Sequence, residues 1–212
     1  MITKKQTKLL IILDGWGHSD VVENNAIAQA KTPVWDKLNE QFPHSLISTS
    51  GKEVGLPGEQ MGNSEVGHLN LGAGRVVKQD FTRIHNEIKN GDFLRNPILK
   101  NSLEYANDNN KAVHIMGLLS DGGVHSHEEQ IHAMLEMTKK HDCKEVYLHI
   151  FVDGRDCAQK SAKKYIQTLE DKISEIGIGE IVSVIGRYFS MDRDNRWARV
   201  RCAYELLAKG KG

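Results

Sequence analysis

The 212-residue sequence has no long apolar run and no excess of charge of either sign. Its longest strongly apolar run, residues 9–13, has five residues, whereas a helix that crosses a bilayer needs about 20. The 28 Lys and Arg residues balance 28 Asp and Glu residues, so the sequence offers no basic region for nucleic acid or anionic lipid. We therefore expect a soluble, cytoplasmic protein with neither a nucleic-acid partner nor a membrane partner.

Cysteine is also scarce, and its spacing argues against two further classes of protein. Cys143, Cys157 and Cys202 are odd in number and far apart, which disfavours a disulfide framework, a zinc knuckle and a paired redox motif. The composition is otherwise that of a folded chain, with 39% hydrophobic and 26% charged residues. Its length suits one or two domains.

The second part of the chain has a pattern of alternating strands and helices. Apolar, β-branched runs predict buried strands at residues 113–119, 146–152 and 181–185. Residues 128–140 and 160–176 lie between these runs and show the helical spacing of apolar residues. Because strands that alternate with helices form parallel sheets with right-handed crossovers, we expect an α/β fold.

Further helices are predicted on both sides of this region. Apolar spacing favours helices near residues 81–90 and 97–107, and a last helix over residues 195–208. The face of the last helix that is expected to point inward carries Trp197, Val200, Tyr204 and Leu207.

The first part of the chain has few elements with which to build a core. Residues 9–13 and 45–49 are predicted as strands, and the Thr-Pro pair at residues 32–33 opens a predicted helix. Small domains hide a low fraction of their surface, so these elements alone can hardly bury a core. We expect residues 1–79 to be part of a larger sheet, and residues 80–212 to belong to a different domain.

Polar residues cluster just after the predicted strands, where ligands bind in open α/β sheets. Four segments, each combining Gly with Asp, Arg or His, are residues 14–17, 120–127, 153–156 and 186–194. Asp-Gly pairs are also common in turns, but their repetition at successive strand ends favours a ligand site. Glycine lets the backbone approach a ligand while neighbouring side chains converge on it.

Arginine is concentrated at one of these strand ends. Five of the nine arginines follow the third strand predicted in the α/β region. Arg187 and Arg193 fall in the loop, where a guanidinium group can bind a phosphate or carboxylate through two hydrogen bonds. Arg155 beside Asp156 suggests a second cation next to a base, and His125 can donate to the same anion. On the following helix we expect a solvated face whose arginines pair with Asp192, Asp194 and Glu205; these arginines are Arg196, Arg199 and Arg201.

A glycine-rich segment contains Ser64 in the motif Met-Gly-Asn-Ser-Glu-Val-Gly-His, residues 61–68. The spacing of its glycines differs from the hydrolase elbow, and it is not a Gly-Lys-Ser phosphate loop. Ser64 is therefore either a helix N-cap or a nucleophile beside free backbone N–H groups. A nucleophilic serine needs an activator, and a metal ion held by Asp14 and Ser64 is the natural one. These two ligands are fewer than a catalytic ion normally takes.

Five motifs together resemble one known family. The motifs, which follow one another along the chain, are residues 13–17, 61–68, 119–127, 153–156 and 186–194. In these motifs the sequence is similar to the cofactor-independent phosphoglycerate mutases of the alkaline phosphatase superfamily. The resemblance implies an α/β fold in which residues 1–79 belong to an alkaline-phosphatase-like domain. Residues 80–212 then belong to a parallel-sheet α/β transferase domain that binds the substrate.

The resemblance also implies an activity, the glycolytic and gluconeogenic interconversion of 3-phosphoglycerate and 2-phosphoglycerate. It implies a phosphoserine intermediate on Ser64 and two divalent metal ions, usually manganese, one of which is bound by Asp14 and Ser64. Asp156 is then the base and acid at the glycerate hydroxyls. The residues that the resemblance assigns to phosphoglycerate binding are His125, Arg155, Asp156, Arg187 and Arg193. The full-length enzyme is expected to be a monomer.

Length is the main departure from the family, whose members are more than twice as long. We therefore expect an amino-terminal fragment that lacks most metal ligands and has little or no mutase activity. The alternatives are a metal-dependent phosphatase or phosphopentomutase of the same superfamily, and a non-catalytic module that captures phosphorylated acids through its arginines. A further alternative is a metal site at Asp121, His125 and His127.

Overall fold

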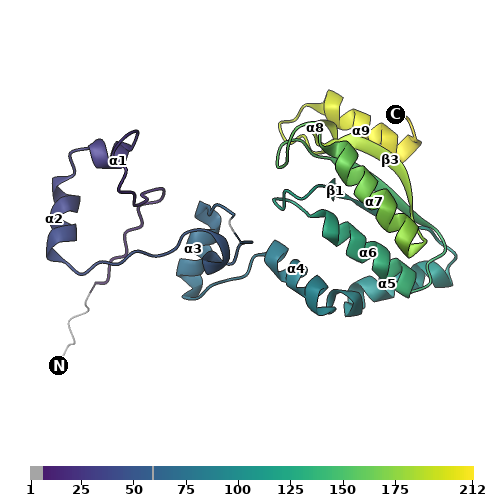
Figure 1. Cartoon of the computed structure of the whole chain (residues 1–212), viewed down its shortest axis with the longest axis horizontal. Coiled ribbons are helices and arrows are strands. Elements are labelled where there is room, and N and C mark those ends of the chain that lie inside the picture. Colours follow the sequence, from purple (N-terminus) through teal and green to yellow (C-terminus); the bar gives the residue numbers. More distant parts are fainter. Residues whose placement is uncertain (1–6, 59) are drawn as a thin grey trace. The chain divides into compact units, whose positions relative to one another are not determined.

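The chain divides into two compact units. The computed structural model describes residues 7–58 and 60–212, and the units are Met1–Gln79 and Asp80–Gly212 (Figure 1). The division falls at the residue where the sequence places the domain boundary. Among the described residues, no helix is both long and apolar enough to span a bilayer.

The second unit is built on a three-stranded parallel sheet. Its strands are β1 (Val113–Leu119), β2 (Val146–Val152) and β3 (Glu180–Gly186), hydrogen-bonded in the order β1-β2-β3. The crossover helices are α6 (Glu128–Lys140) and α7 (Ala162–Ile176). The α/β fold predicted from alternating strands and helices is therefore confirmed.

Helices α6 and α7 pack together with the sheet and form the core of this unit (Figure 1). The large apolar side chains that are at most 1% exposed are Leu119, Leu135, Met137, Leu148, Ile150 and Leu169. Burying one side chain of this size stabilises a fold by about 1.5–3 kcal/mol relative to leaving it exposed. The core therefore holds the carboxyl ends of the strands in fixed positions.

One irregularity interrupts the pairing of β2 with β3. Leu148 pairs with Ile181, whereas the next residue of β2, His149, pairs with Ser183. Val182 is therefore an extra residue in β3, which is the definition of a β-bulge. The bulge lies in the strand that leads into Arg187.

The remaining helices of this unit include one whose orientation differs from its prediction. They are α4 (Asp80–Asn90), η2 (Phe93–Arg95), α5 (Pro97–Asp108), α8 (Arg187–Ser190) and α9 (Trp197–Lys209). The inward face predicted for α9 is wrong at Trp197, Tyr204 and Leu207, which are 70%, 64% and 36% exposed, whereas Val200 is half-buried and Ala203 is buried. Helix α9 packs on α8 and on β3. The buried residue of this helix is the small Ala203.

The first unit is mainly helical where it has regular structure. Its elements are α1 (Ala26–Gln29), α2 (Pro33–Gln41), η1 (Gly51–Val54) and α3 (Ser64–Ala73). Helix α2 confirms the helix predicted after the Thr-Pro pair. The strands predicted at residues 9–13 and 45–49 are wrong, since both segments are irregular and their large apolar side chains are exposed. An extended segment becomes a strand by hydrogen bonding to a neighbour, and no segment within the described residues pairs with either of them.

A few specific contacts fix the start of α3. The apolar cluster between η1 and α3 consists of Val54, Leu56 and Val66. Asn70 donates from Nδ2 to the Val54 carbonyl oxygen at 2.9 Å and accepts from the Val77 N–H at 2.7 Å. Glycine is required at Gly55, because its φ is +85° and a Cβ atom would lie 2.0 Å from the Val77 carbonyl oxygen. These contacts hold Ser64 at the first turn of the helix.

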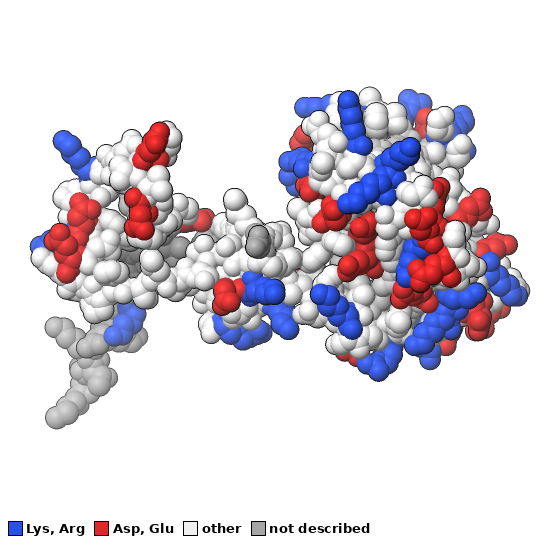
Figure 2. Space-filling model, in the orientation of Figure 1, with Lys and Arg blue, Asp and Glu red and all other residues white. Residues whose placement is uncertain are grey.

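Charged side chains of both signs are interspersed on the surface of the second unit. On the face shown in Figure 2, Lys and Arg side chains lie next to Asp and Glu side chains. An anion that binds this unit therefore depends on a local group of cations rather than on a broad basic face.

Candidate functional site

The carboxyl ends of β1, β2 and β3 border a cavity of about 820 Å³. The strands are parallel, so the loops that follow them meet at one edge of the sheet. The loops bring together all five residues that the resemblance assigns to substrate binding, and these line the cavity: His125, Arg155, Asp156, Arg187 and Arg193.

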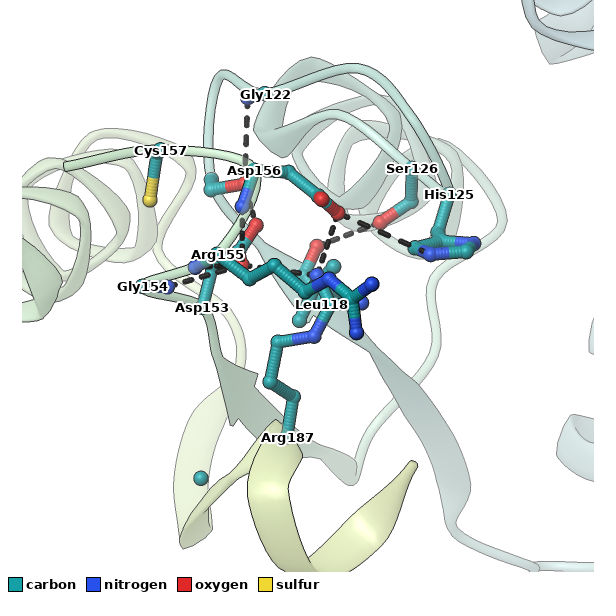
Figure 3. A network of polar contacts seen from close by, with 12 residues as sticks. Leu118, Gly122, His125, Ser126, Asp153, Gly154, Arg155, Asp156, Cys157 and Arg187 are labelled. Atoms are coloured by element: carbon teal, nitrogen blue, oxygen red, sulfur yellow. Dashed lines mark hydrogen bonds and ion pairs between the residues drawn. The ribbon is translucent and has the colours of Figure 1, made fainter. Parts of the chain in front are cut away.

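Asp153, directly after β2, organises this edge of the sheet (Figure 3). Its side chain is completely buried, and Oδ1 accepts hydrogen bonds from the backbone N–H groups of Gly154, Arg155 and Asp156 at 2.9–3.1 Å. Oδ2 accepts from the Ser120 hydroxyl at 2.7 Å, which joins the loop after β1 to the loop after β2. Burial by itself raises the pKa of Asp153, but these hydrogen bonds outweigh burial and hold the pKa well below its usual range.

Arg187 reaches the same carboxylate from the start of α8. Its Nη1 donates to Asp153 Oδ1 at 3.0 Å and also to Asp156 Oδ2. Figure 3 shows the side chain extending toward both carboxylates, and only 14% of it is exposed. Burial by itself lowers the pKa of Arg187, but the bonds to Asp156 and Asp153 raise it overall, so the guanidinium group stays charged.

Asp156 lies between Arg187 and His125. Its side chain is 11% exposed, and its Oδ2 lies 3.8 Å from Nε2 of His125. The loop after β1 can come this close because Gly122 has no side chain, since a Cβ atom there would lie 2.7 Å from the Asp156 carbonyl oxygen. The carboxylate of Asp156 therefore has a guanidinium group on one side and an imidazole on the other.

The side chains of Arg155 and Arg193 are exposed at the cavity. Among residues 7–58 and 60–212, neither guanidinium group has a hydrogen bond or an ion pair. A guanidinium group binds a phosphate or carboxylate through two parallel hydrogen bonds. These two arginines are therefore available to a ligand that carries two anionic groups.

Arg199 differs from its prediction as a solvated residue of the last helix. It lines the cavity, its guanidinium carbon lies 3.7 Å from the centre of the Tyr188 ring, and Nη1 is 3.5 Å from Asp192 Oδ1. Arg201 agrees with the prediction, because its side chain is 75% exposed and pairs with Glu205. Asp192 is among the partners that the sequence predicted for these arginines, whereas helical spacing could not reveal the contact with Tyr188, which precedes the helix.

In the first unit, the hydroxyl of Ser64 donates a hydrogen bond to Asp14 Oδ2 at 2.7 Å. These two residues are 50 positions apart in the sequence, and the structure places them together as the metal hypothesis requires. The alternative that Ser64 is the N-cap of its helix is wrong. Asn63 is the N-cap, and its Oδ1 accepts a hydrogen bond from the Val66 N–H at 3.0 Å.

His68 is a neighbour of Ser64 that sequence reasoning missed. Its Nδ1 lies 2.8 Å from the Ser64 carbonyl oxygen and 3.3 Å from the Ser64 hydroxyl oxygen. A carbonyl oxygen only accepts hydrogen bonds, so Nδ1 carries the proton in this arrangement and cannot take the proton of the hydroxyl. The spacing of four residues on a helix is the signal that would have placed His68 beside Ser64.

The chain offers an incomplete set of metal ligands. The Asp14 carboxylate and the Ser64 hydroxyl are adjacent oxygen donors, which fits a hard divalent cation in donor type. In the part of the chain that the structure describes, however, no group of three or more His, Cys, Asp or Glu residues is arranged to hold a metal ion.

The alternative metal site at Asp121, His125 and His127 is therefore wrong. The carboxylate of Asp121 accepts a hydrogen bond from the Tyr165 hydroxyl at 2.6 Å and lies 3.6 Å from Lys164 Nζ. His127 is the N-cap of α6, and its Nδ1 accepts a hydrogen bond from the backbone of the first turn. Both side chains are thus engaged in local structure.

The fold and the site define an α/β domain with an arginine-lined cavity at the carboxyl ends of its strands. Residues 84–212 match the family described as "BPG-independent PGAM N-terminus", and the chain belongs to this family. The relationship to cofactor-independent phosphoglycerate mutases, recognised from five sequence motifs, is thereby confirmed.

Similar proteins carry the name 2,3-bisphosphoglycerate-independent phosphoglycerate mutase. The protein from Ruthia magnifica is 81% identical over 211 residues, and the match covers 100% of this chain and 41% of the relative. The protein from Serratia proteamaculans is 56% identical over 212 residues, with the same coverage of 100% and 41%. The chain thus spans 41% of the length of these curated relatives.

A solved structure is similar as well. It is described as Leishmania mexicana phosphoglycerate mutase at low cobalt concentration, and it matches with a TM-score of 0.64 and 33% sequence identity. The match covers 85% of this chain and 34% of that chain.

Proposed function

We propose that this chain takes part in the interconversion of 3-phosphoglycerate and 2-phosphoglycerate. The observation that carries the proposal is the cavity at the strand ends, which is lined by the carboxylate of Asp156 together with Arg155, Arg187, Arg193 and His125. Phosphoglycerate has a phosphate, a carboxylate and hydroxyl oxygen atoms between which the phosphoryl group moves. Cations for the two anionic groups and a carboxylate for the hydroxyl protons are what this substrate requires.

Each side chain of the cavity has a role in this proposal. Arg155 and Arg193, whose guanidinium groups are exposed, bind the anionic groups of the substrate through paired hydrogen bonds. Arg187 and His125 complete the anion-binding groups, and Asp156 takes and returns protons at the glycerate hydroxyls. The phosphoryl group passes to Ser64 as a phosphoserine and returns to the other hydroxyl of the retained glycerate.

Residues 1–79 belong, in this proposal, to the phosphatase-like domain, and residues 80–212 to the transferase domain. Asp14 and Ser64 would be two of the ligands of one of two divalent ions, which we propose to be manganese. A divalent ion bound there lowers the pKa of the Ser64 hydroxyl. Asp14 accepts the hydroxyl hydrogen bond at 2.7 Å and so orients the Ser64 oxygen. We assign the enzyme to glycolysis and gluconeogenesis in the cytoplasm, as a monomer.

A second candidate, binding without turnover, is favoured by the metal ligands. Asp14 and Ser64 supply two donors, whereas a catalytic ion normally takes three or more protein ligands. We therefore expect the 212-residue chain alone to bind phosphoglycerate without converting it.

Titration of the chain with 3-phosphoglycerate, followed by calorimetry, tests the binding part of the proposal. Arg155→Ala and Arg193→Ala are expected to weaken binding about 10-fold to 100-fold, since a hydrogen bond to a charged group contributes about 1.5–3 kcal/mol. Arg201→Ala is the matched control, because Arg201 is 75% exposed on α9 and pairs with Glu205. Absence of saturable binding, or equal losses in all three variants, would reject the proposal.

The reaction itself is tested on the whole protein with manganese present. The expected product of 3-phosphoglycerate is 2-phosphoglycerate with no release of inorganic phosphate, and Ser64→Ala is expected to abolish it. Release of phosphate without isomerisation would instead identify a phosphatase of the same superfamily.

A further inference from the structure

The carboxylate of Asp153 accepts five hydrogen bonds from other groups of this chain. A carboxylate has about four lone-pair positions, and the groups bonded to this one are three backbone N–H groups, the Ser120 hydroxyl and Arg187. The side chain is completely buried. Four of these five donors bond to Oδ1 and one, the Ser120 hydroxyl, bonds to Oδ2, so it is burial that keeps the carboxylate from accepting a substrate proton or contacting a ligand.

Arg187, in contrast, is shared between two carboxylates of different kinds. One is Asp153, which is buried and held by the backbone. The other is Asp156, whose Oδ2 also faces the imidazole of His125 at 3.8 Å. A substrate hydroxyl that engages Asp156 competes with the guanidinium group for the same oxygen, so Arg187 needs another partner to stay in place.

We propose that Asp153 is a positioning residue that holds Arg187 at the cavity, so that Asp156 is free to engage the substrate. This inference rests on the proposed function, because it assumes that the cavity binds phosphoglycerate. An arginine that is already fixed by a buried carboxylate loses little side-chain freedom when the ligand binds. Asp153 thus favours binding without touching the ligand.

Asp153 could instead have a purely structural role, which would be to brace the loops after β1 and β2. The variant Asp153→Asn separates this role from the positioning of Arg187. Asparagine keeps an oxygen for the three backbone N–H groups, and its amide nitrogen can donate to the Ser120 oxygen. The substitution removes the negative charge that holds Arg187. If Asp153 only braces the loops, losing this charge leaves anion binding unchanged or tighter. If Asp153 positions Arg187, anion binding becomes weaker.

The experiment compares the chain with Asp153→Asn and with a control, Asp108→Asn, which makes the same change at an exposed position at the end of α5. The first measurement is the NMR signal of the Arg187 guanidinium protons without ligand, made in an Asp156→Ala background that removes the second carboxylate bonded to Arg187. We expect ordered signals that disappear in Asp153→Asn and persist in the control. The second measurement is titration with 3-phosphoglycerate, whose dissociation constant is expected to rise about tenfold in Asp153→Asn and to stay the same in the control.

Retention of the Arg187 signals in Asp153→Asn, or unchanged or tighter binding, would overturn the inference. If the unsubstituted chain does not bind 3-phosphoglycerate, the proposed function fails, while the NMR comparison still decides whether Asp153 holds Arg187. Ser120→Ala covers the case in which Asp153→Asn does not fold, because it removes the bond to Oδ2 and keeps the charge. It is expected to keep the Arg187 signals and to change affinity by less than about threefold. If Ser120→Ala lost both the Arg187 signals and the affinity for 3-phosphoglycerate, the role of Asp153 would be to brace the loops.

Discussion

Replacing Tyr165 by Phe removes one hydrogen bond that ties the loop after β1 to α7. The Tyr165 hydroxyl donates to Asp121 Oδ1 at 2.6 Å, and the tyrosine is only 4% exposed. The bond raises the pKa of Tyr165 and lowers the pKa of Asp121, because it stabilises the neutral donor and the ionised acceptor together. Tyr165→Phe keeps the ring and its packing, so the bond is the main quantity that changes.

The expected loss in the free energy of unfolding follows from how exposed Tyr165 and Asp121 are. A hydrogen bond to a charged group contributes about 1.5–3 kcal/mol. The side chain of Asp121 is 47% exposed, so water replaces part of what the carboxylate loses. We therefore expect Tyr165→Phe to lower the free energy of unfolding by about 1–1.5 kcal/mol at neutral pH.

Urea unfolding of Tyr165→Phe and of a control, Tyr105→Phe, measures this loss. Tyr105 is 67% exposed, so the control is expected to change stability by less than about 0.5 kcal/mol. The pKa of Asp121 is lower in the folded state than in the unfolded state, so its contribution is present above the unfolded pKa, about 3.9. The contribution is lost as the pH falls through the folded pKa. Equal stability of the two variants at neutral pH, or a loss that does not shrink in acid, would refute the reasoning.

Three further predictions test other parts of the structure. Leu169→Ala, at a fully buried site of α7, is expected to cost about 2–5 kcal/mol in urea unfolding, and Leu207→Ala on the half-exposed side of α9 markedly less. Gly55→Ala has no room for its methyl group and is expected to speed hydrogen exchange in the first unit while leaving the second unchanged. Burial and the charge of His114 lower the pKa of His149, so protonation opposes folding. Thermal stability is expected to fall as the pH drops below about 6.5, and less steeply in His149→Gln.

The strands and crossover helices of the second unit were predictable because their signals are local. Residues 113–119 and 146–152 are continuous apolar runs, and the helix between them has clear apolar spacing. Residues 9–13 are just as apolar, yet they form no strand. The difference is that a strand depends on a partner at a distance along the chain, which an apolar run by itself does not supply.

The sequence predicted which residues line the cavity better than it predicted how those residues contact one another. Gly, Asp and Arg after successive strands correctly placed Arg155 and Arg187 at one cavity. The same pattern singled out Asp156 as a base beside Arg155, but it gave no sign that Asp153 is buried and accepts hydrogen bonds from three backbone N–H groups while Asp156 is partly exposed. That distinction depends on the path of the backbone between the two residues. Likewise, the contact of Arg199 with the Tyr188 ring could not be assigned from its helix, because Tyr188 lies outside the helix, whereas the pair with Asp192 was predicted.

Because of the bulge at Val182, β3 has one residue more than the segment of β2 that pairs with it. The number of residues in β3 that pair with β2 determines where Arg187 lies. Successive residues of a strand point to opposite faces, and each adds about 3.3 Å to its length. Deleting Val182 would therefore leave each residue of β3 opposite one residue of β2 and would keep the pairing of His149 with Ser183, so Arg187 would stay beside Asp153. The bulge thus gives β3 one residue more than the pairing requires. Loss of that residue keeps Arg187 in reach of Asp153, whereas loss of a second residue from β3 would draw Arg187 back by about 3.3 Å, which exceeds the 3.0 Å between its Nη1 and Asp153 Oδ1.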